Sequence, residues 1–380
     1  MDRLGLLAFV AAGALLAYVY LIYPPLIVLL ARIRPRPTPR ADWLPRVSFI
    51  ITAHNEEHHI AAKLDNTLGL DYPSENLEIL VSSDGSTDAT DAIVERYRDR
   101  GVLLVAAAER GGKTAATQRA VRRATGELLV FSDATGMYNR PALRRLAGAA
   151  AAPEVGCVSG RVDYEYGSSL IAHGFRLYQT VEKRIRRAES TCGTLTSVSG
   201  SIHAARRSLF PTADPHQNYD LLMPLAMAER GLRTIYEDGA VSLEVSRTRP
   251  RDEFRARVRA GIRAFSYVAE LRRRRWVRTY PFFLWAVISH KLLRWFSPLW
   301  LLLLLGGHLL LAARGGGWLW ALIPHAGIYL LAALAAALPG ERGPRWLAAP
   351  AFVGTACAGF LVGLTLFLSG RRAATWESPR

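Results

Sequence analysis

The first 31 residues contain the feature that most restricts what this chain can fold into, because no charged side chain occurs between Leu4 and Ala31. A helix needs about 20 apolar residues to cross the hydrocarbon core of a bilayer, so this run is long enough to span one. A cleavable signal peptide would instead have an apolar stretch of about 7–15 residues followed by a small-residue cleavage site. The run here continues further and ends in a basic segment that begins at Arg32. We therefore predict a transmembrane helix over residues 1–31.

Three more uncharged runs lie near the C-terminus, at residues 297–313, 315–340 and 346–370. We predict three transmembrane helices over residues 297–370, followed by a tail at 371–380. Basic residues favour the cytoplasmic side, which places residues 32 to about 295 in the cytoplasm of a multi-pass protein of the inner (plasma) membrane. Arg371 and Arg372 would then lie outside, against the rule. Either one C-terminal run is re-entrant or these two arginines are tolerated.

Composition excludes two other classes of protein. Of the 380 residues, 50% are hydrophobic, which is too high for a disordered chain. The three cysteines, Cys157, Cys192 and Cys357, are far apart in the sequence and show no paired spacing. We therefore expect neither a disulfide framework nor a zinc site. The net charge of +16 leaves nucleic acid, anionic lipid or a phosphorylated substrate as possible partners.

The segment between the apolar runs, residues 32–250, has the pattern of an α/β domain. Short apolar or β-branched runs alternate with helical patterns, which predicts a mixed, mainly parallel sheet flanked by helices. The expected strands are residues 47–52, 77–82, 102–107, 128–131 and 155–159, and the expected helices include 56–67, 89–97 and 114–124. In such a sheet, ligands bind at the carboxyl ends of the strands, so the residues that follow each strand are the candidate site.

Polar clusters follow four successive expected strands. They begin at Thr52, Ser83, Gly111 and Ser132, and they read TAHNEE, SDGSTD, GGK and SDAT. Each cluster alone is weak evidence, because Asp-Gly-Ser is a common turn and an Asp often caps a helix. Four clusters at four strand ends are together much harder to obtain by accident.

The chemistry of these clusters suits a nucleoside diphosphate bound with a divalent cation. Asp133 can hold Mg²⁺ or Mn²⁺ against phosphate oxygens, because hard cations prefer oxygen ligands. Lys113 offers a compact positive charge to a diphosphate, and Asp84 suits a ribose, a uracil edge or the metal shell. The P-loop pattern of many ATPases does not occur in this sequence, which weakens the alternative of an ATPase.

The four clusters, in this order, resemble those of family 2 glycosyltransferases with the GT-A fold, over about residues 46–275. The apolar segments on both sides resemble those of the membrane-embedded cellulose, hyaluronan and poly-N-acetylglucosamine synthases. The resemblance assigns Asp133 to the metal, although Thr135 stands where the family has a second acid. It assigns Asp220 as the general base, a role that is compatible with a helix N-cap. Donor-binding residues are then Thr52, His54, Asn55, Glu56, Asp84 and Lys113, and acceptor-binding residues are Gly200 and Ser201.

The chain is densely basic from Arg247 to Arg278, with apolar residues every three or four positions, and we assign residues 251–296 to interfacial helices. This pattern predicts amphipathic helices at an anionic membrane surface. Nucleic-acid binding is the alternative, but the position next to apolar spans favours the membrane, and we expect no nucleic-acid partner. The resemblance aligns Arg257 with the Arg of a Gln-x-x-Arg-Trp motif that contacts the donor diphosphate, while the Gln and Trp are missing. A second Arg-Trp pair, Arg294 and Trp295, is interpreted as an interface anchor.

The expected activity is an inverting transfer of a sugar from a UDP-sugar to a polysaccharide acceptor at the membrane, forming and exporting a β-linked exopolysaccharide. The missing motif residues keep a second possibility open, a single transfer to a membrane lipid. A third possibility, of another class, is an inactive membrane scaffold. The candidate spans carry no charge in their apolar cores, which argues against a transporter.

Overall fold

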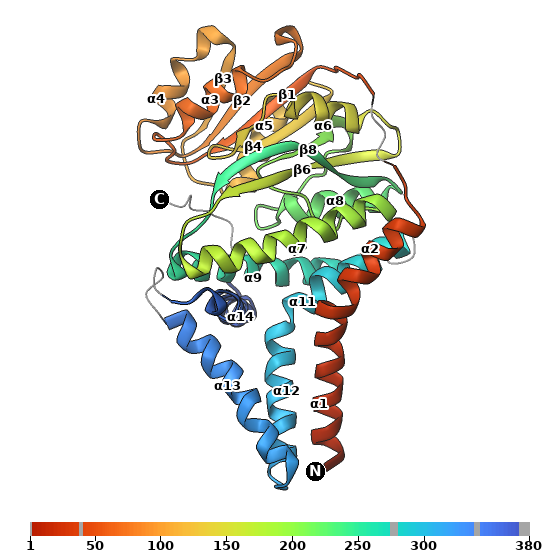
Figure 1. Cartoon of the computed structure of the whole chain (residues 1–380). Coiled ribbons are helices and arrows are strands. Elements are labelled where there is room, and N and C mark those ends of the chain that lie inside the picture. Colours follow the sequence, from red (N-terminus) through yellow and green to blue (C-terminus); the bar gives the residue numbers. More distant parts are fainter. Residues whose placement is uncertain (1, 38–40, 274–279, 338–342, 372–380) are drawn as a thin grey trace.

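The structure is a computed structural model that describes residues 2–37, 41–273, 280–337 and 343–371 (Figure 1). An α/β domain with a central sheet lies at one end. Several apolar helices extend away from it, and two long helices lie between these parts. The α/β architecture with additional apolar helices agrees with the expectation from the sequence.

The domain is built on one eight-stranded sheet with the order β3-β2-β1-β4-β7-β6-β8-β5. The pairs β1–β2, β1–β4, β2–β3 and β6–β8 are parallel, whereas β7 runs antiparallel to both of its neighbours and β5 antiparallel to β8. The strands are β1 (Val47–Ala53), β2 (Leu77–Asp84), β3 (Val102–Ala107), β4 (Leu128–Asp133), β5 (Met137–Tyr138), β6 (Val155–Glu165), β7 (His203–Arg206) and β8 (Arg233–Val245). The mixed, mainly parallel sheet is confirmed, and β5, β7 and β8 are additions to the five expected strands.

Helices cover both faces of the sheet. One face packs on α3 (Ile60–Leu68), α4 (Thr90–Glu95) and α6 (Ala142–Ala150) through a core that includes Phe49, Leu64 and Val130. The other face packs on α5 (Lys113–Arg123) and α8 (Tyr219–Glu229), where Ile50, Leu129 and Ala120 form one cluster. The alternation of buried residues along β1 thus supplies two cores, as expected for a sheet covered on both faces. Short 3₁₀ turns are η2 (Ser74–Asn76), η3 (Arg98–Arg100), η4 (Arg207–Leu209) and η7 (Arg345–Leu347).

Two long helices, α7 (Leu170–Cys192) and α9 (Pro250–Arg273), lie between the sheet and the apolar helices (Figure 1). The amphipathic helix expected from residue 251 is present as α9, although residues 274–279 of the basic stretch lie outside the described residues. Part of its apolar face is covered by protein. A Cβ at Gly261 would lie 3.2 Å from the Cα of Gly363 on α14, so the two helices touch through glycines.

The apolar runs form helices of the expected length. The N-terminal run forms α1 (Asp2–Ala17), the π-helical turn η1 (Tyr18–Ile22) and α2 (Tyr23–Ile33), and the C-terminal runs form α12 (Ser297–Ala312), α13 (Gly317–Ala337) and α14 (Ala348–Leu368). Three segments are long and apolar enough to cross a membrane: Arg3–Ile33, Gly317–Ala335 and Arg345–Leu368. A fourth arises if Pro281–Trp295, which comprises α10 (Pro281–Ala286), η6 (Val287–Leu292) and α11 (Leu293–Trp295), counts as one span with α12 across a 61° bend. Figure 1 shows α14 nearly end-on beneath α9, so its direction differs from that of α12 and α13.

Candidate functional site

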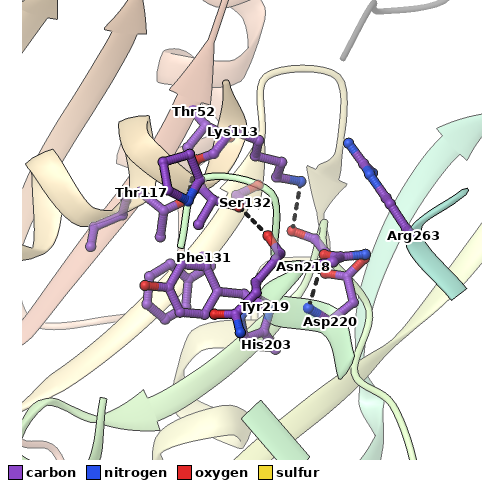
Figure 2. Close-up of a pocket in the computed structure, with 15 residues that line it drawn as sticks. Thr52, Lys113, Thr117, Phe131, Ser132, His203, Asn218, Tyr219, Asp220 and Arg263 are labelled. Atoms are coloured by element: carbon purple, nitrogen blue, oxygen red, sulfur yellow. Dashed lines mark hydrogen bonds between the residues drawn. The ribbon is translucent and has the colours of Figure 1, made fainter. Parts of the chain in front are cut away.

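A cavity of about 1060 Å³ opens beside the carboxyl ends of β1 and β4, and a smaller pocket adjoins it (Figure 2). The residues that line both are Thr52, Lys113, Gly200, Asn218, Asp220 and Arg263. Asp133, Glu56 and Ser201 line the larger cavity. β1 and β4 are paired in register, with Thr52 opposite Asp133, so the two strands end at the same level. The structure therefore brings most of the expected site residues around one space.

The first two polar clusters bind each other. The backbone N–H of Asn55 donates to Ser86 Oγ at 3.1 Å, and Asn55 Oδ1 accepts from the backbone N–H of Thr87 at 2.8 Å. Asn55 has a φ of 55°, a left-handed conformation that Asn tolerates better than most residues. The backbone N–H of Glu56 donates to Thr90 Oγ1 at 2.7 Å. These contacts make one rigid rim from the loops after β1 and β2.

Asp84 is fully buried and does not line the cavity. Its Oδ1 accepts from the backbone N–H of Gly111 at 2.9 Å, and its Oδ2 accepts from that of Gly112 at 2.7 Å. Its backbone carbonyl lies 2.8 Å from Nδ1 of His54, which therefore donates to it. Asp84 thus holds the turn that precedes α5, and Gly112 adopts a φ of 91° there that suits glycine. The structure places Asp84 behind the site, where it positions Lys113.

Lys113 is the first residue of α5, and its ammonium contacts the carboxylate of Asp133. The same Nζ donates to the carbonyl oxygen of Gly200 at 3.4 Å. Burial alone would lower the pKa of Lys113, but the nearby carboxylates of Asp133 and Asp220 raise it above its ordinary value. The lysine is therefore a charged group between two carboxylates.

Asp220 lies in the first turn of α8, which Asn218 caps through its side-chain oxygen. A Cβ at Gly200 would lie 2.8 Å from Asp220 Oδ1 and 3.1 Å from Lys113 Nζ, so only glycine fits without displacing them. Next to Asp220, His203 is buried on β7 and stacks on Phe131 with 4.7 Å between ring centroids. Burial lowers the pKa of His203 to about 4, which keeps this ring neutral. The carboxylate of Asp220 faces the cavity from a helix start (Figure 2).

Arg257 is not brought to the cavity. Its guanidinium pairs with Glu253 at 2.6 Å and lies over the rings of Tyr178 and Phe352 at 5.5 and 5.0 Å. Arg263, six residues further along α9 and therefore on a different face, lines both the pocket and the cavity, and Figure 2 shows its side chain extending toward the space above Asp220. Arg263 has no hydrogen bond or ion pair with any side chain in the described part of the chain. The helix phase thus turns Arg263, and not Arg257, toward the site.

One further residue of the cavity and one buried lysine near it were missed in the sequence. Glu244 on β8 lines the larger cavity, and its Oε1 has no hydrogen-bond partner among residues 2–37, 41–273, 280–337 and 343–371. Burial raises the pKa of this carboxyl group. Lys63 on α3 is fully buried and donates to the carbonyl oxygen of Gly136 at 2.5 Å, while burial lowers its pKa to about 7. Neither residue belongs to a recognisable sequence motif, because long-range packing brings Glu244 to the cavity and Lys63 close to Asp133 and Glu244.

A divalent cation suits Asp133 better than any other group of this site. Its side chain is 34% exposed, faces the cavity and already attracts one cation, Lys113. No group of three or more His, Cys, Asp or Glu side chains with metal-binding geometry occurs within the described residues. Mg²⁺ is commonly bound through one or two carboxylates together with substrate phosphates and water, so a single carboxylate fits that mode.

Comparison with known proteins gives the family. Residues 48–212 match the model of glycosyl transferase family 2. Among solved structures, the mannosyltransferase PcManGT from Pyrobaculum calidifontis, in complex with GDP-Man and Mn²⁺, superposes with a TM-score of 0.74 at 25% identity, covering 96% of this chain and 99% of that one.

Two curated relatives match smaller parts of their own length. An N-acetylglucosaminyltransferase of Azorhizobium caulinodans is 27% identical over 52% of this chain and 54% of that protein. The β-monoglucosyldiacylglycerol synthase of Synechocystis is 30% identical over 31% of this chain and 25% of that protein. The chain thus spans only about a quarter to a half of these two relatives. The family resemblance is confirmed: the chain contains a domain of glycosyl transferase family 2 with the GT-A fold.

Proposed function

We propose that the chain is an inverting glycosyltransferase that uses a nucleoside-diphosphate sugar as donor. The observation that carries the proposal is the convergence of Asp133, Lys113 and Asp220 at the end of β1 and β4 in a family 2 domain. One carboxylate suits a metal, the lysine suits a diphosphate, and the second carboxylate is open to the cavity. A binding protein without catalysis would not require this second carboxylate.

In the proposed mechanism, Asp220 accepts the proton of the acceptor hydroxyl as that oxygen attacks the anomeric carbon. Lys113 and Arg263 place positive charge beside the departing diphosphate, where negative charge develops in the transition state. Asp133 would hold Mg²⁺ or Mn²⁺, which supplies further charge neutralisation when bound. Attack from the face opposite the leaving group converts an α-linked donor into a β-linked product. In this mechanism Arg263 contacts the donor diphosphate, the role that the family resemblance assigned to Arg257.

The donor proposed is a UDP-sugar, as the resemblance of the motifs implies. The rim formed by Thr52, His54, Asn55 and Glu56, supported from behind by Asp84, is the proposed nucleotide site. Since PcManGT was solved with GDP-Man, GDP-mannose belongs in the same screen.

The proposed acceptor is a growing polysaccharide, which Gly200 and Ser201 would contact. A lipid acceptor is the second candidate, and one observation favours it. The cavity that contains Asp220 also reaches Trp295 and Phe360, which lie on the apolar helical segments. A lipid with a polar head could therefore place its head at Asp220 and its tail among these helices.

We also propose that residues 1–31 and 297–370 lie in the inner membrane, with residues 32–250 in the cytoplasm and 251–296 at its surface. The apolar helices and the basic residues after Ile33 support this arrangement. Extraction tests it, because inserted helices are released by detergent, whereas charge-held proteins are released by salt.

Product analysis tests the function. Full-length protein in detergent is incubated with radiolabelled UDP-sugars and GDP-mannose, each with Mg²⁺ or Mn²⁺, in the presence of membrane lipids. A labelled polymer supports a polysaccharide synthase, and a single labelled lipid supports the second candidate. Folded protein that neither transfers nor hydrolyses any donor would indicate an inactive scaffold.

A further inference from the structure

The backbone at Lys113 is held in place, but the ammonium group at the end of its side chain can move. The buried carboxylate of Asp84 binds the backbone of Gly111 and Gly112, and α5 begins at the next residue. The four-carbon side chain of Lys113 then extends into the cavity, with 26% of its surface exposed. A lysine in this position has several rotamers available, so its cation can exchange one partner for another without movement of the backbone.

The ammonium has two oxygen neighbours and a further carboxylate nearby. It contacts Oδ1 of Asp133 and lies 3.4 Å from the carbonyl oxygen of Gly200, and the carboxylate of Asp220 also lies next to this glycine. Asp133 has no other ion pair in the described ranges, so Lys113 is its closest counter-charge, and the buried Lys63 acts on it only from further away. A divalent cation on Asp133 would compete with Lys113 for the charge of this one carboxylate.

We propose that Lys113 is the counter-ion of Asp133 before the donor binds, and that it moves to the donor diphosphate when a divalent cation takes this carboxylate. The proposal rests on the proposed function, because it requires a metal and a diphosphate in this site. Two cations repel each other at such short range, so they cannot share one exposed carboxylate at full strength. The diphosphate supplies the anion to which the displaced ammonium passes.

This exchange couples the two ligands. The metal alone must displace Lys113 without offering it a new partner, so it binds weakly. The metal together with a diphosphate binds more tightly, because the lysine then keeps an anionic partner. If Lys113 were only a fixed phosphate ligand, its removal would weaken nucleotide binding and leave the affinity for metal alone unchanged. Affinity for the metal alone therefore separates the two roles.

The test is a titration of the full-length protein in detergent with Mn²⁺, without nucleotide. The electron paramagnetic resonance signal of free Mn²⁺ measures how much of the metal remains unbound. Lys113→Met removes the charge at similar length and should tighten Mn²⁺ binding by about tenfold or more, as expected for loss of a charged hydrogen bond that competes. Lys113→Arg keeps the charge and should bind as weakly as wild type. Lys183→Met is the matched control, because Lys183 lines the same cavity but pairs with Asp163 at 2.6 Å.

A second titration adds UDP or GDP. In wild type, either nucleotide that binds should tighten Mn²⁺ binding, and this gain should shrink in Lys113→Met. Unchanged or weaker Mn²⁺ binding by folded Lys113→Met, with binding still abolished by Asp133→Asn, overturns the counter-ion role alone. Mn²⁺ binding that survives Asp133→Asn overturns the metal site in the proposed function as well. Absence of Mn²⁺ binding from both wild type and Lys113→Met also overturns both.

Discussion

The two ends of the large cavity are held together by different interactions. At the strand end, apart from the ion pair of Lys113 and Asp133, side chains bind backbone groups of neighbouring loops: Asn55 binds Thr87, and Asp84 binds Gly111 and Gly112. At the helix end, side chains bind other side chains. Glu253 pairs with Arg257, and Glu182 on α7 pairs with Lys291 at 3.2 Å and with Arg294 at 2.8 Å.

Because of this difference, the geometry of the loops at the strand end should respond less to ionic strength than the ion pairs at the helix end. Loops fixed through backbone hydrogen bonds keep their geometry when ionic strength changes, because these bonds involve no pair of opposite ions. Ion pairs between long side chains depend on helix phase and on what surrounds them. We therefore expect the chemistry and the binding of the nucleotide to depend on the strand end, and Arg263 at the helix end to adjust donor affinity further.

The largest effect is expected at Asp220, where the two ends meet. Asp220→Asn keeps the shape of the side chain but cannot accept a proton at neutral pH. Turnover should fall about 10²–10⁴-fold, the usual contribution of a positioned base, while donor affinity changes little. Donor titration beside turnover measures both quantities.

Two outcomes would contradict this role. Nearly unchanged turnover would mean that the base lies elsewhere. Loss of donor binding would place Asp220 in the nucleotide site and leave the mechanism without a base.

Gly200→Ala tests how closely Lys113 and Asp220 are spaced. Its new Cβ would lie 2.8 Å from Asp220 Oδ1, so the carboxylate must move. Turnover should fall by about 10- to 100-fold, because misplacement of a reacting group by about 1 Å has effects of that size. Gly306→Ala on α12 is the control, since its Cβ would meet nothing within 4 Å. Equal activities of the two variants would show that the glycine is not needed for this spacing.

The strand end could be predicted from the sequence, because its signals are local. The clusters that begin at Thr52, Ser83, Gly111 and Ser132 follow strands whose apolar runs identify them, and parallel strands bring their carboxyl ends together. β7 and β8 were missed. β7 has only four residues, and β8 carries charged residues such as Glu237 and Asp238 in its middle.

The helix end could be predicted only in outline. The amphipathic pattern of α9 was clear from the sequence. Which of Arg257 and Arg263 faces the cavity, however, depends on which face of α9 packs against α14. Gly359 on α14 contacts Arg257, so that face is covered, and Arg263 is left to face the cavity. Arg294 pairs with Glu182, and Trp295 lines the cavity, neither of which follows from a motif. Contacts between helices far apart in sequence supplied this information.

The two arginines of α9 give a matched pair of variants. Arg263→Gln should weaken donor binding about tenfold, because it removes a charged hydrogen-bond donor near the diphosphate. Arg257→Gln should leave donor affinity unchanged and destabilise the fold by about 3 kcal/mol, because Glu253 stays buried without its closest partner. Donor titration and thermal unfolding of both variants separate the two effects. The reverse pattern would restore Arg257 to the donor site.

The smallest effect concerns His203, which lies on the strand side next to Asp220. Burial lowers the pKa of His203 from its ordinary 6.5 to about 4, so the folded protein keeps the ring neutral at pH values where the unfolded chain protonates it. The unfolded state then binds more protons, and stability falls as the pH drops from about 6.5 to about 4. Between pH 7.5 and 5.5 the loss of stability from this residue should be about 1 kcal/mol.

His203→Gln removes the titrating group, so its unfolding midpoint should fall less over this interval than that of wild type, whatever its stability at pH 7.5. His58→Gln is the matched control for removal of a histidine at the surface, since the His58 side chain is 85% exposed. A slope in His203→Gln equal to that of wild type would mean that His203 has the same pKa in the folded and the unfolded protein, so that burial does not keep the ring beside Asp220 neutral.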